Sequence, residues 1–517
     1  MPRKTFKIRP VGIIDRRGIV TTIGDKNVLT RENLMVVGQT DEERYLKKMA
    51  GSRRFNSTTV SSTKPVTSLF RYYTKADVRK TFFFCDGSIY YIGSNGGTTQ
   101  LESLFNKNAY PVFVEMRVSA QDVAYFMDGF NGMYSHDGNL ENKFQRESAV
   151  SLNFVGATSF LDRMVGFEED SEDLYLSKNL SPTDFTDSTD AVVITVGARR
   201  GSKIVQIAVL NETLYIFKSD SIWVLEGRTP SEFSVREVVT DRGLAARRSL
   251  KDAEGNLVGL MSDFEVWSFA GTRESMKCIS YNAALGGDLS KDIPEIINRD
   301  RMAEVCAEYH NFMYRISFVE TGEIQNNLEW CYNSVNKTDS FTRGNKVSCY
   351  VKYDRPPDKN ELLTGRSDTG IVMYQYDSNL VYDKDGTSPT MSIRVKTKFI
   401  GMDSARNFRV RRIWLNTGVL GKNPLPVRTY IDGRNAPSDS ITEQMDTYGE
   451  SKSPITAMSI ASQDAITSRQ IPRHNNSKCQ NIAFEIREET PDRDFQMSSF
   501  EIEIISKNLK RSRYAAV

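Results

Sequence analysis

The segment from Glu212 to Gly227, ETLYIFKSDSIWVLEG, predicts a β-hairpin whose two strands are apolar at successive positions. Leu214 to Phe217 form one apolar run, Ile222 to Leu225 form the other, and Lys218 to Ser221 are expected to form the turn. A sheet with one face in water alternates apolar and polar residues, so strands like these must be covered on both faces. This indicates a fold in which small sheets lie between neighbouring sheets.

An aliphatic residue followed by an aromatic residue recurs along the chain. Between the aromatic positions 90 and 374 there are six intervals, which average about 47 residues, the period of four-stranded propeller blades with loop insertions. The pairs are Ile89-Tyr90, Met133-Tyr134, Leu174-Tyr175, Leu214-Tyr215, Val266-Trp267, Met313-Tyr314 and Met373-Tyr374. Two of them lie close to Asp-Gly dipeptides typical of tight hairpin turns, Asp86-Gly87 and Asp128-Gly129.

We therefore predict an all-β chain with a β-propeller of about seven blades over residues 61–388. A series of ordinary β-sandwiches with similar spacing is the alternative. The blade cores are expected to include Leu214, Tyr215, Trp223 and Trp267. Trp223 is expected to fill the space between two blades, so Trp223→Ala should cost about 3–5 kcal/mol of stability.

The two ends of the chain lack this repeat. Residues 1–60 are expected to form an extended N-terminal arm that leads into the propeller, with Phe6 and Ile8 available for docking on another subunit. Residues 389–507 alternate apolar and polar positions, which predicts a β-sandwich with a long loop near 436–468. Residues 508–517 form a basic tail.

Composition limits the function. Lys and Arg total 68 against 66 Asp and Glu, a balance that argues against a protein whose main role is to grip nucleic acid. Six cysteines and three histidines show no zinc-ligand spacing, and the cysteines are expected to be reduced and buried. No apolar run is long enough for a membrane span, and the basic N-terminus lacks the apolar core of a secretory signal.

No phosphate-binding loop or nucleophile elbow is present, so we expect no enzymatic activity and no cofactor. The acidic cluster from Glu168 to Asp173 is expected to be a solvated loop, with a divalent-cation site as the alternative. Arginine suits bidentate pairing at interfaces, and we expect interface or surface ion pairs rather than DNA contacts from the Arg-Arg pairs. These pairs are Arg16-Arg17, Arg53-Arg54, Arg199-Arg200, Arg247-Arg248 and Arg411-Arg412, of which the first two are assigned to assembly.

The middle of the chain resembles a family of phage structural β-propellers, the packaged-DNA stabilisation, stopper or nozzle proteins below the portal of short-tailed phages. The resemblance spans about residues 50–390. It begins at AGSRRFNSTTVSSTKPVTSLFRYYT and continues through EDLYLSKNLSPTDFTDS and the hairpin described above. The residues that match are Leu214, Tyr215, Phe217, Lys218, Ser221, Ile222, Trp223, Val224 and Leu225, then Gly243, Ala246, Arg248 and Ser249.

The resemblance implies a structural virion protein of the neck or tail, made in the host cytoplasm. Members of the family form rings, commonly hexamers, that extend the portal channel beneath a portal-adaptor ring. Packaged DNA passes through the ring lumen without specific binding. Two alternatives remain open: a carbohydrate- or receptor-binding propeller that acts as an adhesin, and a propeller glycosidase.

Overall fold

The computed structural model describes residues 3–8, 19–20, 28–32, 34–37, 45–49, 51–73, 79–118, 121–198, 201–280, 292–355, 359–375, 393–397, 399–401, 408–417, 423–431, 439–445, 467–471, 481–488 and 496–506. Strands dominate these residues, and the prediction of an all-β chain is confirmed. The helices described are short: α1 (Asp292–Ile296), η1 (Arg247–Ser249), η2 (Arg273–Ser275) and η4 (Arg299–Glu304). In this part of the chain, no helix has the length and hydropathy needed to span a membrane.

The chain divides into two compact units, which are described separately. Unit 1 comprises residues 1–52, 330–344 and 377–517, and unit 2 comprises residues 53–329 and 345–376. Unit 2 is therefore built almost entirely from the middle of the chain, whereas unit 1 combines both ends.

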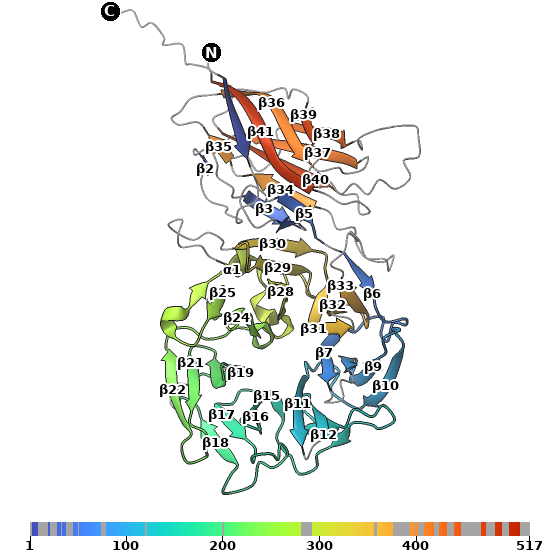
Figure 1. Cartoon of the computed structure of the whole chain (residues 1–517), viewed down its shortest axis with the longest axis vertical. Coiled ribbons are helices and arrows are strands. Elements are labelled where there is room, and N and C mark those ends of the chain that lie inside the picture. The colour runs from blue at the N-terminus through green and yellow to red at the C-terminus, as the bar shows by residue number, and fades with distance from the viewer. Residues whose placement is uncertain are drawn as a thin grey trace, which may run out of the picture. The chain divides into compact units, whose positions relative to one another are not determined.

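Unit 2 contains six four-stranded antiparallel sheets (Figure 1). The first sheet consists of β7 (Val66–Tyr73), β8 (Arg79–Cys85), β9 (Ser88–Ile92) and β10 (Thr98–Ser103). The second consists of β11 (Val112–Val118), β12 (Gln121–Met127), β13 (Met133–His136) and β14 (Gln145–Arg146). The third consists of β15 (Phe154–Phe160), β16 (Arg163–Glu168), β17 (Asp173–Leu176) and β18 (Val192–Thr195). The fourth sheet consists of β19 (Ile204–Leu210), β20 (Thr213–Lys218), β21 (Ile222–Glu226) and β22 (Ser234–Val239). The fifth consists of β23 (Lys251–Asp252), β24 (Leu257–Leu260), β25 (Val266–Phe269) and β26 (Lys277–Cys278).

The sixth sheet joins segments that are far apart in the sequence. It consists of β31 (Val347–Arg355), β32 (Lys359–Arg366) and β33 (Val372–Gln375), followed by β6 (Ser52–Arg54) as the outer strand. An antiparallel hairpin of β27 (Cys306–His310) and β28 (Met313–Phe318) precedes it in the chain, with β29 (Leu328–Asn333) beginning in unit 2 and ending in unit 1.

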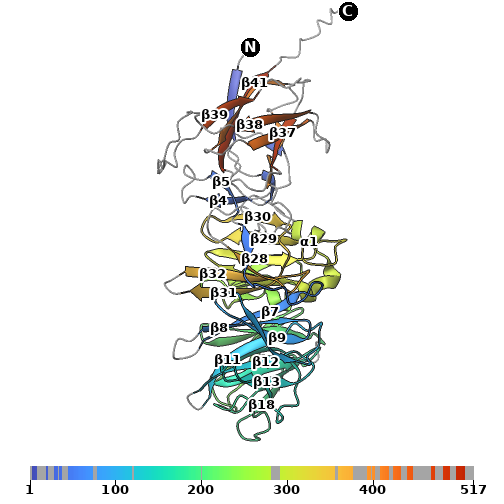
Figure 2. The ribbon, with the colours of Figure 1, turned by 90° about the vertical axis from the view of Figure 1, so that its right-hand side faces the viewer.

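The first strands of successive sheets contact one another. β7 contacts β11, β11 contacts β15, and β15 contacts β19. η1, which immediately precedes β23, contacts both β19 and β27, and β27 contacts β31. β31 in turn contacts β7, and Figure 2 shows β31 and β32 beside β7 and β8.

The hydrophobic core of unit 2 lies between neighbouring sheets. Phe82 and Phe84 of one sheet pack with Phe126 of the next, and Phe167 packs with Ile216 in the same way further along the chain. Similar clusters join the sheets β11–β14 and β15–β18, the sheets β19–β22 and β23–β26, and the first sheet with the sixth. This arrangement explains why middle strands such as β8 and β20 are apolar at successive positions.

Each of the seven aliphatic–aromatic pairs lies in a different sheet of the described chain. Five pairs occupy the third strand of their sheet, but Leu214-Tyr215 and Met313-Tyr314 lie in second strands, β20 and β28. The expected turn is also shorter than predicted: Lys218 ends β20 and is fully buried, and its backbone N–H donates to the carbonyl of Ser221.

The expected core residues differ in burial. Leu214 is fully buried, whereas Tyr215, Trp223 and Trp267 are half-buried at the margins of the clusters between sheets. The Trp223 indole N–H donates to Ser221 Oγ, and the Trp267 ring lies 3.8 Å from the Arg242 guanidinium carbon. Both rings therefore combine apolar packing with polar contacts.

Unit 1 contains strands from both ends of the chain. One sheet has the order β39-β36-β41-β5-β4, with β1 also paired to β41. Its strands are β1 (Arg3–Ile8), β4 (Leu34–Val37), β5 (Tyr45–Lys48), β36 (Phe408–Thr417), β39 (Thr467–Ile471) and β41 (Gln496–Ser506). The other strands of unit 1 are β2 (Ile19–Val20), β3 (Val28–Glu32), β30 (Thr338–Arg343), β34 (Ile393–Thr397), β35 (Phe399–Gly401), β37 (Asn423–Ile431), β38 (Asp439–Met445) and β40 (Asn481–Glu488).

The N-terminal residues differ from the extended arm expected from the sequence. β1 pairs with β41 of the same chain, which places Phe6 opposite Ile502 and Ile8 opposite Phe500. Within the segment expected as a loop near 436–468, β38 pairs with β37. The alternation of apolar residues in β1 was visible in the sequence, but the partner strand lies about 500 positions further along the chain (Arg3 opposite Ile505). Arg16, Arg17 and residues 508–517 lie outside the described residues.

Candidate functional site

The residues that carry the family resemblance after the hairpin form a segment from Gly243 to Ser249, called here the arginine segment. It connects β22 to β23 and ends in η1. Gly243 lies against the end of β20, where an added Cβ would be 2.1 Å from the carbonyl oxygen of Lys218. The Leu244 N–H donates to that carbonyl at 2.9 Å. A side chain at position 243 would therefore displace the segment from the hairpin.

Ser249 ends the arginine segment in a fully buried position and joins three pieces of backbone. Its hydroxyl donates to the Ala246 carbonyl at 2.7 Å and accepts from the Leu260 N–H at 3.0 Å. Its own carbonyl accepts from the hydroxyl of Tyr314, on β28, at 2.7 Å. These bonds fix the short helical turn η1 against β24 and β28.

Arg247 connects the arginine segment to the sheets that contain β15 and β19. Its Nε donates to the Val205 carbonyl at 3.1 Å, and its Nη1 donates to the Val155 carbonyl at 3.4 Å. Its Nη2 lies 3.0 and 2.8 Å from the two carboxylate oxygens of Glu169. The planar guanidinium suits this set of acceptors, because its donors diverge in fixed directions.

Arg248 extends from the same turn toward other sheets. Its guanidinium carbon lies 4.6 Å from the centre of the Tyr110 ring, and Nη2 donates to the carbonyl of Ser348 at the start of β31. Tyr110 directly precedes the sheet β11–β14. Burial raises the pKa of the Tyr110 hydroxyl, while the nearby Arg248 charge lowers it. The two adjacent arginines thus contact different sheets of unit 2.

Lys218, which the sequence pattern places in the hairpin turn, instead ends the strand β20. Its side chain is 0% exposed, and Nζ donates to the Val196 carbonyl at 2.6 Å and lies 3.9 Å from a Glu172 carboxylate oxygen. Gly197 lies beside it with φ of +65°, and an added Cβ would approach the Trp223 ring to 2.8 Å. A buried ammonium needs such partners because its desolvation is costly.

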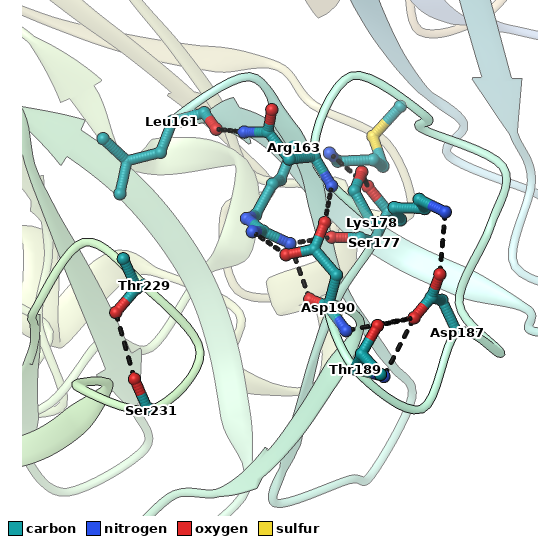
Figure 3. A network of polar contacts seen from close by, with 11 residues as sticks. Leu161, Arg163, Ser177, Lys178, Asp187, Thr189, Asp190, Thr229 and Ser231 are labelled. Carbon is teal, nitrogen blue, oxygen red and sulfur yellow. Dashed lines mark hydrogen bonds and ion pairs between the residues drawn. The ribbon is translucent and has the colours of Figure 1, made fainter.

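A second polar network joins the strands and the long turn of the sheet β15–β18 (Figure 3). Arg163, which is almost fully buried, donates to the carbonyls of Ser177 and Asp190 and pairs with the Asp190 carboxylate at 2.5 Å. Lys178 pairs with Asp187 at 2.7 Å. Hydrogen bonds from Arg163 and from the Asn179 backbone lower the pKa of Asp190. The network connects the turn between β17 and β18 to β16.

The acidic cluster from Glu168 to Asp173 is divided among different partners. Glu168 accepts from the Asn153 N–H, Asp173 accepts from the Thr195 hydroxyl, and Glu169 and Glu172 pair with Arg247 and Lys218 as described. Within the part of the chain that the structure describes, no group of three His, Cys, Asp or Glu side chains has the geometry of a metal site.

The arginine pairs assigned to assembly are described only in part. Arg53 is exposed and lies 5.3 Å from the centre of the Tyr374 ring, and Arg54 donates to the Asn56 carbonyl at 2.7 Å. Both therefore have contacts within their own chain. Arg199 and Arg200 are outside the described residues.

Three of the four cysteines of unit 2 are enclosed in the protein interior, and Cys278 is half-buried. Cys85, Cys306 and Cys349 are buried, and burial raises the pKa of the Cys306 thiol to about 12 and that of Cys349 to about 11. The thiolate is the nucleophilic form of cysteine. At neutral pH these three side chains act as small apolar groups.

No protein-family model matches this chain, and a comparison with curated proteins finds no protein of similar sequence.

We expect Arg247→Lys to lower the free energy of unfolding by about 1–3 kcal/mol, because an ammonium cannot reproduce the bonds to Glu169, Val155 and Val205. Arg236→Lys is the matched control, since Arg236 is exposed and pairs with Glu226 on the surface; its effect should be at most about 0.5 kcal/mol. Urea unfolding curves of both variants measure the difference. Equal effects would show that Arg247 does not connect the sheets.

Proposed function

We propose that unit 2 is a closed β-propeller of seven blades, and that the protein is a structural virion component of a phage neck or tail. The six four-stranded sheets and the hairpin β27–β28, extended by β29, supply seven candidate blades. The first strands of the sheets contact one another in a series that returns from β31 to β7, which supports a closed propeller. Completion of the last sheet by β6, from the start of the unit, supports it further.

The observation that carries this proposal is the role of the arginine segment. Gly243, Ser249 and Arg248 are residues on which the resemblance to phage structural propellers rests, and their contacts connect sheets of unit 2 to one another. Residues used in this way maintain a rigid body. Rigidity is what a ring component needs when it transmits force between neighbouring rings or around a DNA channel.

In this proposal, copies of the chain form a cyclic homo-oligomer, most simply a hexamer, through heterologous contacts. The ring lies below a portal-adaptor ring and extends the portal channel. Packaged DNA passes through the lumen of the ring, which retains or releases the genome. A lumen without a strong positive charge suits this role, since a basic lining would hold DNA during ejection.

Size-exclusion chromatography with light scattering tests assembly. The chain alone, and the chain mixed with the portal and adaptor proteins of the same virion, are compared at equal concentration. A complex containing six copies, formed alone or with the adaptor, is the expected result. If the chain is a monomer in both samples and binds host-surface glycans on an array, the ring proposal is wrong and the adhesin alternative is favoured.

A further inference from the structure

His136 lies at the junction between the first two sheets of unit 2. It ends β13, and its side chain is 2% exposed. Its ring stacks on Phe144 at 4.5 Å and meets the edge of Phe82, on β8, at 5.4 Å. Phe82 and Phe144 belong to the aromatic cluster that holds the two sheets together. The imidazole is therefore part of the packing between sheets.

The hydrogen bonds around His136 require the neutral ring. Nδ1 accepts from the Gly138 N–H at 2.9 Å, so it carries no proton, and Nε2 is left to donate to the Asn142 carbonyl at 3.3 Å. A proton added at Nδ1 would turn this nitrogen into a second donor. It would then face the Gly138 N–H with no acceptor between them.

The Gly138 backbone cannot easily move away from a protonated ring. It has φ of +81° and lies against Tyr72, on β7, where an added Cβ would be 2.5 Å from the ring. The Tyr72 hydroxyl in turn donates to the carbonyl of Asp122, on β12. Movement of the turn after His136 therefore disturbs contacts made by both sheets.

The charged groups around His136 act in opposite directions. Burial disfavours the imidazolium most strongly, and Lys80 of β8 also opposes it. The Asn142 carbonyl and the neighbouring Asp137 carboxylate favour it, and the net result is a lowered pKa. Because the folded-state pKa lies below that of the unfolded chain, the neutral ring contributes stability above about pH 6.5, the ordinary value for histidine. That contribution is lost as the pH falls further.

We propose that the packing between the sheet β7–β10 and the sheet β11–β14 is an acid-sensitive joint that opens when His136 is protonated. Opening would expose the phenylalanine side chains that both sheets contribute to this cluster. The other sheets of unit 2 would keep their packing at the same pH. This acid-sensitive joint depends only on the contacts of His136, so the proposal does not require that the chain forms a ring.

Hydrogen exchange of the full chain, corrected for the intrinsic pH dependence of exchange, tests this proposal. Between about pH 7 and pH 5, opening of residues 79–92 and 121–146 should increase by up to about tenfold per pH unit, the limit for one proton. His136→Gln is the matched variant, because an amide can accept from Gly138 and donate to Asn142 without titrating. We expect that variant to lose the additional opening at low pH.

If the variant fails to fold, a titration of the wild-type histidines by nuclear magnetic resonance tests the same proposal. The His136 ring should give the signals of the neutral form protonated at Nε2 and a midpoint below that of free histidine. A midpoint at or above the free value, equal opening of all sheets, or unchanged acid opening in His136→Gln would overturn the proposal.

Discussion

Phe126→Ala is expected to lower the free energy of unfolding by about 3–5 kcal/mol, the range for truncating a buried phenylalanine. Phe126, on β12, is 0% exposed and lies at the centre of the aromatic cluster between the first two sheets. Its ring is 4.7 Å from that of Phe105, 5.1 Å from that of Phe113 and 5.8 Å from that of Phe84. The alanine variant therefore leaves a cavity lined by both sheets.

Phe130→Ala is the matched control, because Phe130 is the same residue four positions later and is 61% exposed. Its removal should change the free energy of unfolding by at most about 0.5 kcal/mol, as for other surface substitutions. Urea titrations followed by circular dichroism give both values. Similar losses in the two variants would contradict the assignment of the core to the space between sheets.

Asn56→Ala is expected to weaken the sheet β31-β32-β33-β6 by about 2–4 kcal/mol, since it removes the acceptor of the buried Val372 N–H and one of the two donors to the Gly370 carbonyl, which keeps the Val60 N–H. Asn56 is 1% exposed and follows β6. Its Nδ2 donates to the Gly370 carbonyl at 3.1 Å, and its Oδ1 accepts from the Val372 N–H at 3.0 Å. These bonds hold the start of unit 2 on its last sheet.

The readout for Asn56→Ala is local as well as global. Proteolysis and hydrogen exchange should show opening first at residues 53–62 and at β33, before the sheets β11–β14 and β15–β18 respond. Thr58→Ala, at an exposed position of the same segment, should behave like the wild type. Uniform loss of protection throughout unit 2 would show that this joint is not where unit 2 opens.

The sequence predicted the all-β class and a series of small sheets marked by the aliphatic–aromatic pairs, because strands buried on both faces leave a clear apolar signal. It did not predict which strand holds each pair, since second and third strands both carry buried apolar residues. Lys218 illustrates the limit: a lysine beside Ser219 and Asp220 has the composition of a turn, and only the distant Val196 carbonyl and Glu172 explain its burial.

The candidate site was partly visible in the sequence. Arg247 and Arg248 were identified as a pair, and Arg247 forms an ion pair with the exposed Glu169, but the other hydrogen-bond acceptors of the two arginines are backbone carbonyls of other sheets. Backbone acceptors have no signature in the sequence. The pairing of β1 with β41 was missed for a related reason, because an alternating strand does not indicate which distant edge it joins.

Electron cryomicroscopy of the assembled virion tests the central claim of this account most directly. We predict several copies of the chain arranged as a closed ring around the DNA channel below the portal, with unit 2 of each copy resolved as seven blades closed by β6. A single copy per particle, a position at the tip of a fibre, or an open row of sheets in place of a closed propeller would contradict the account.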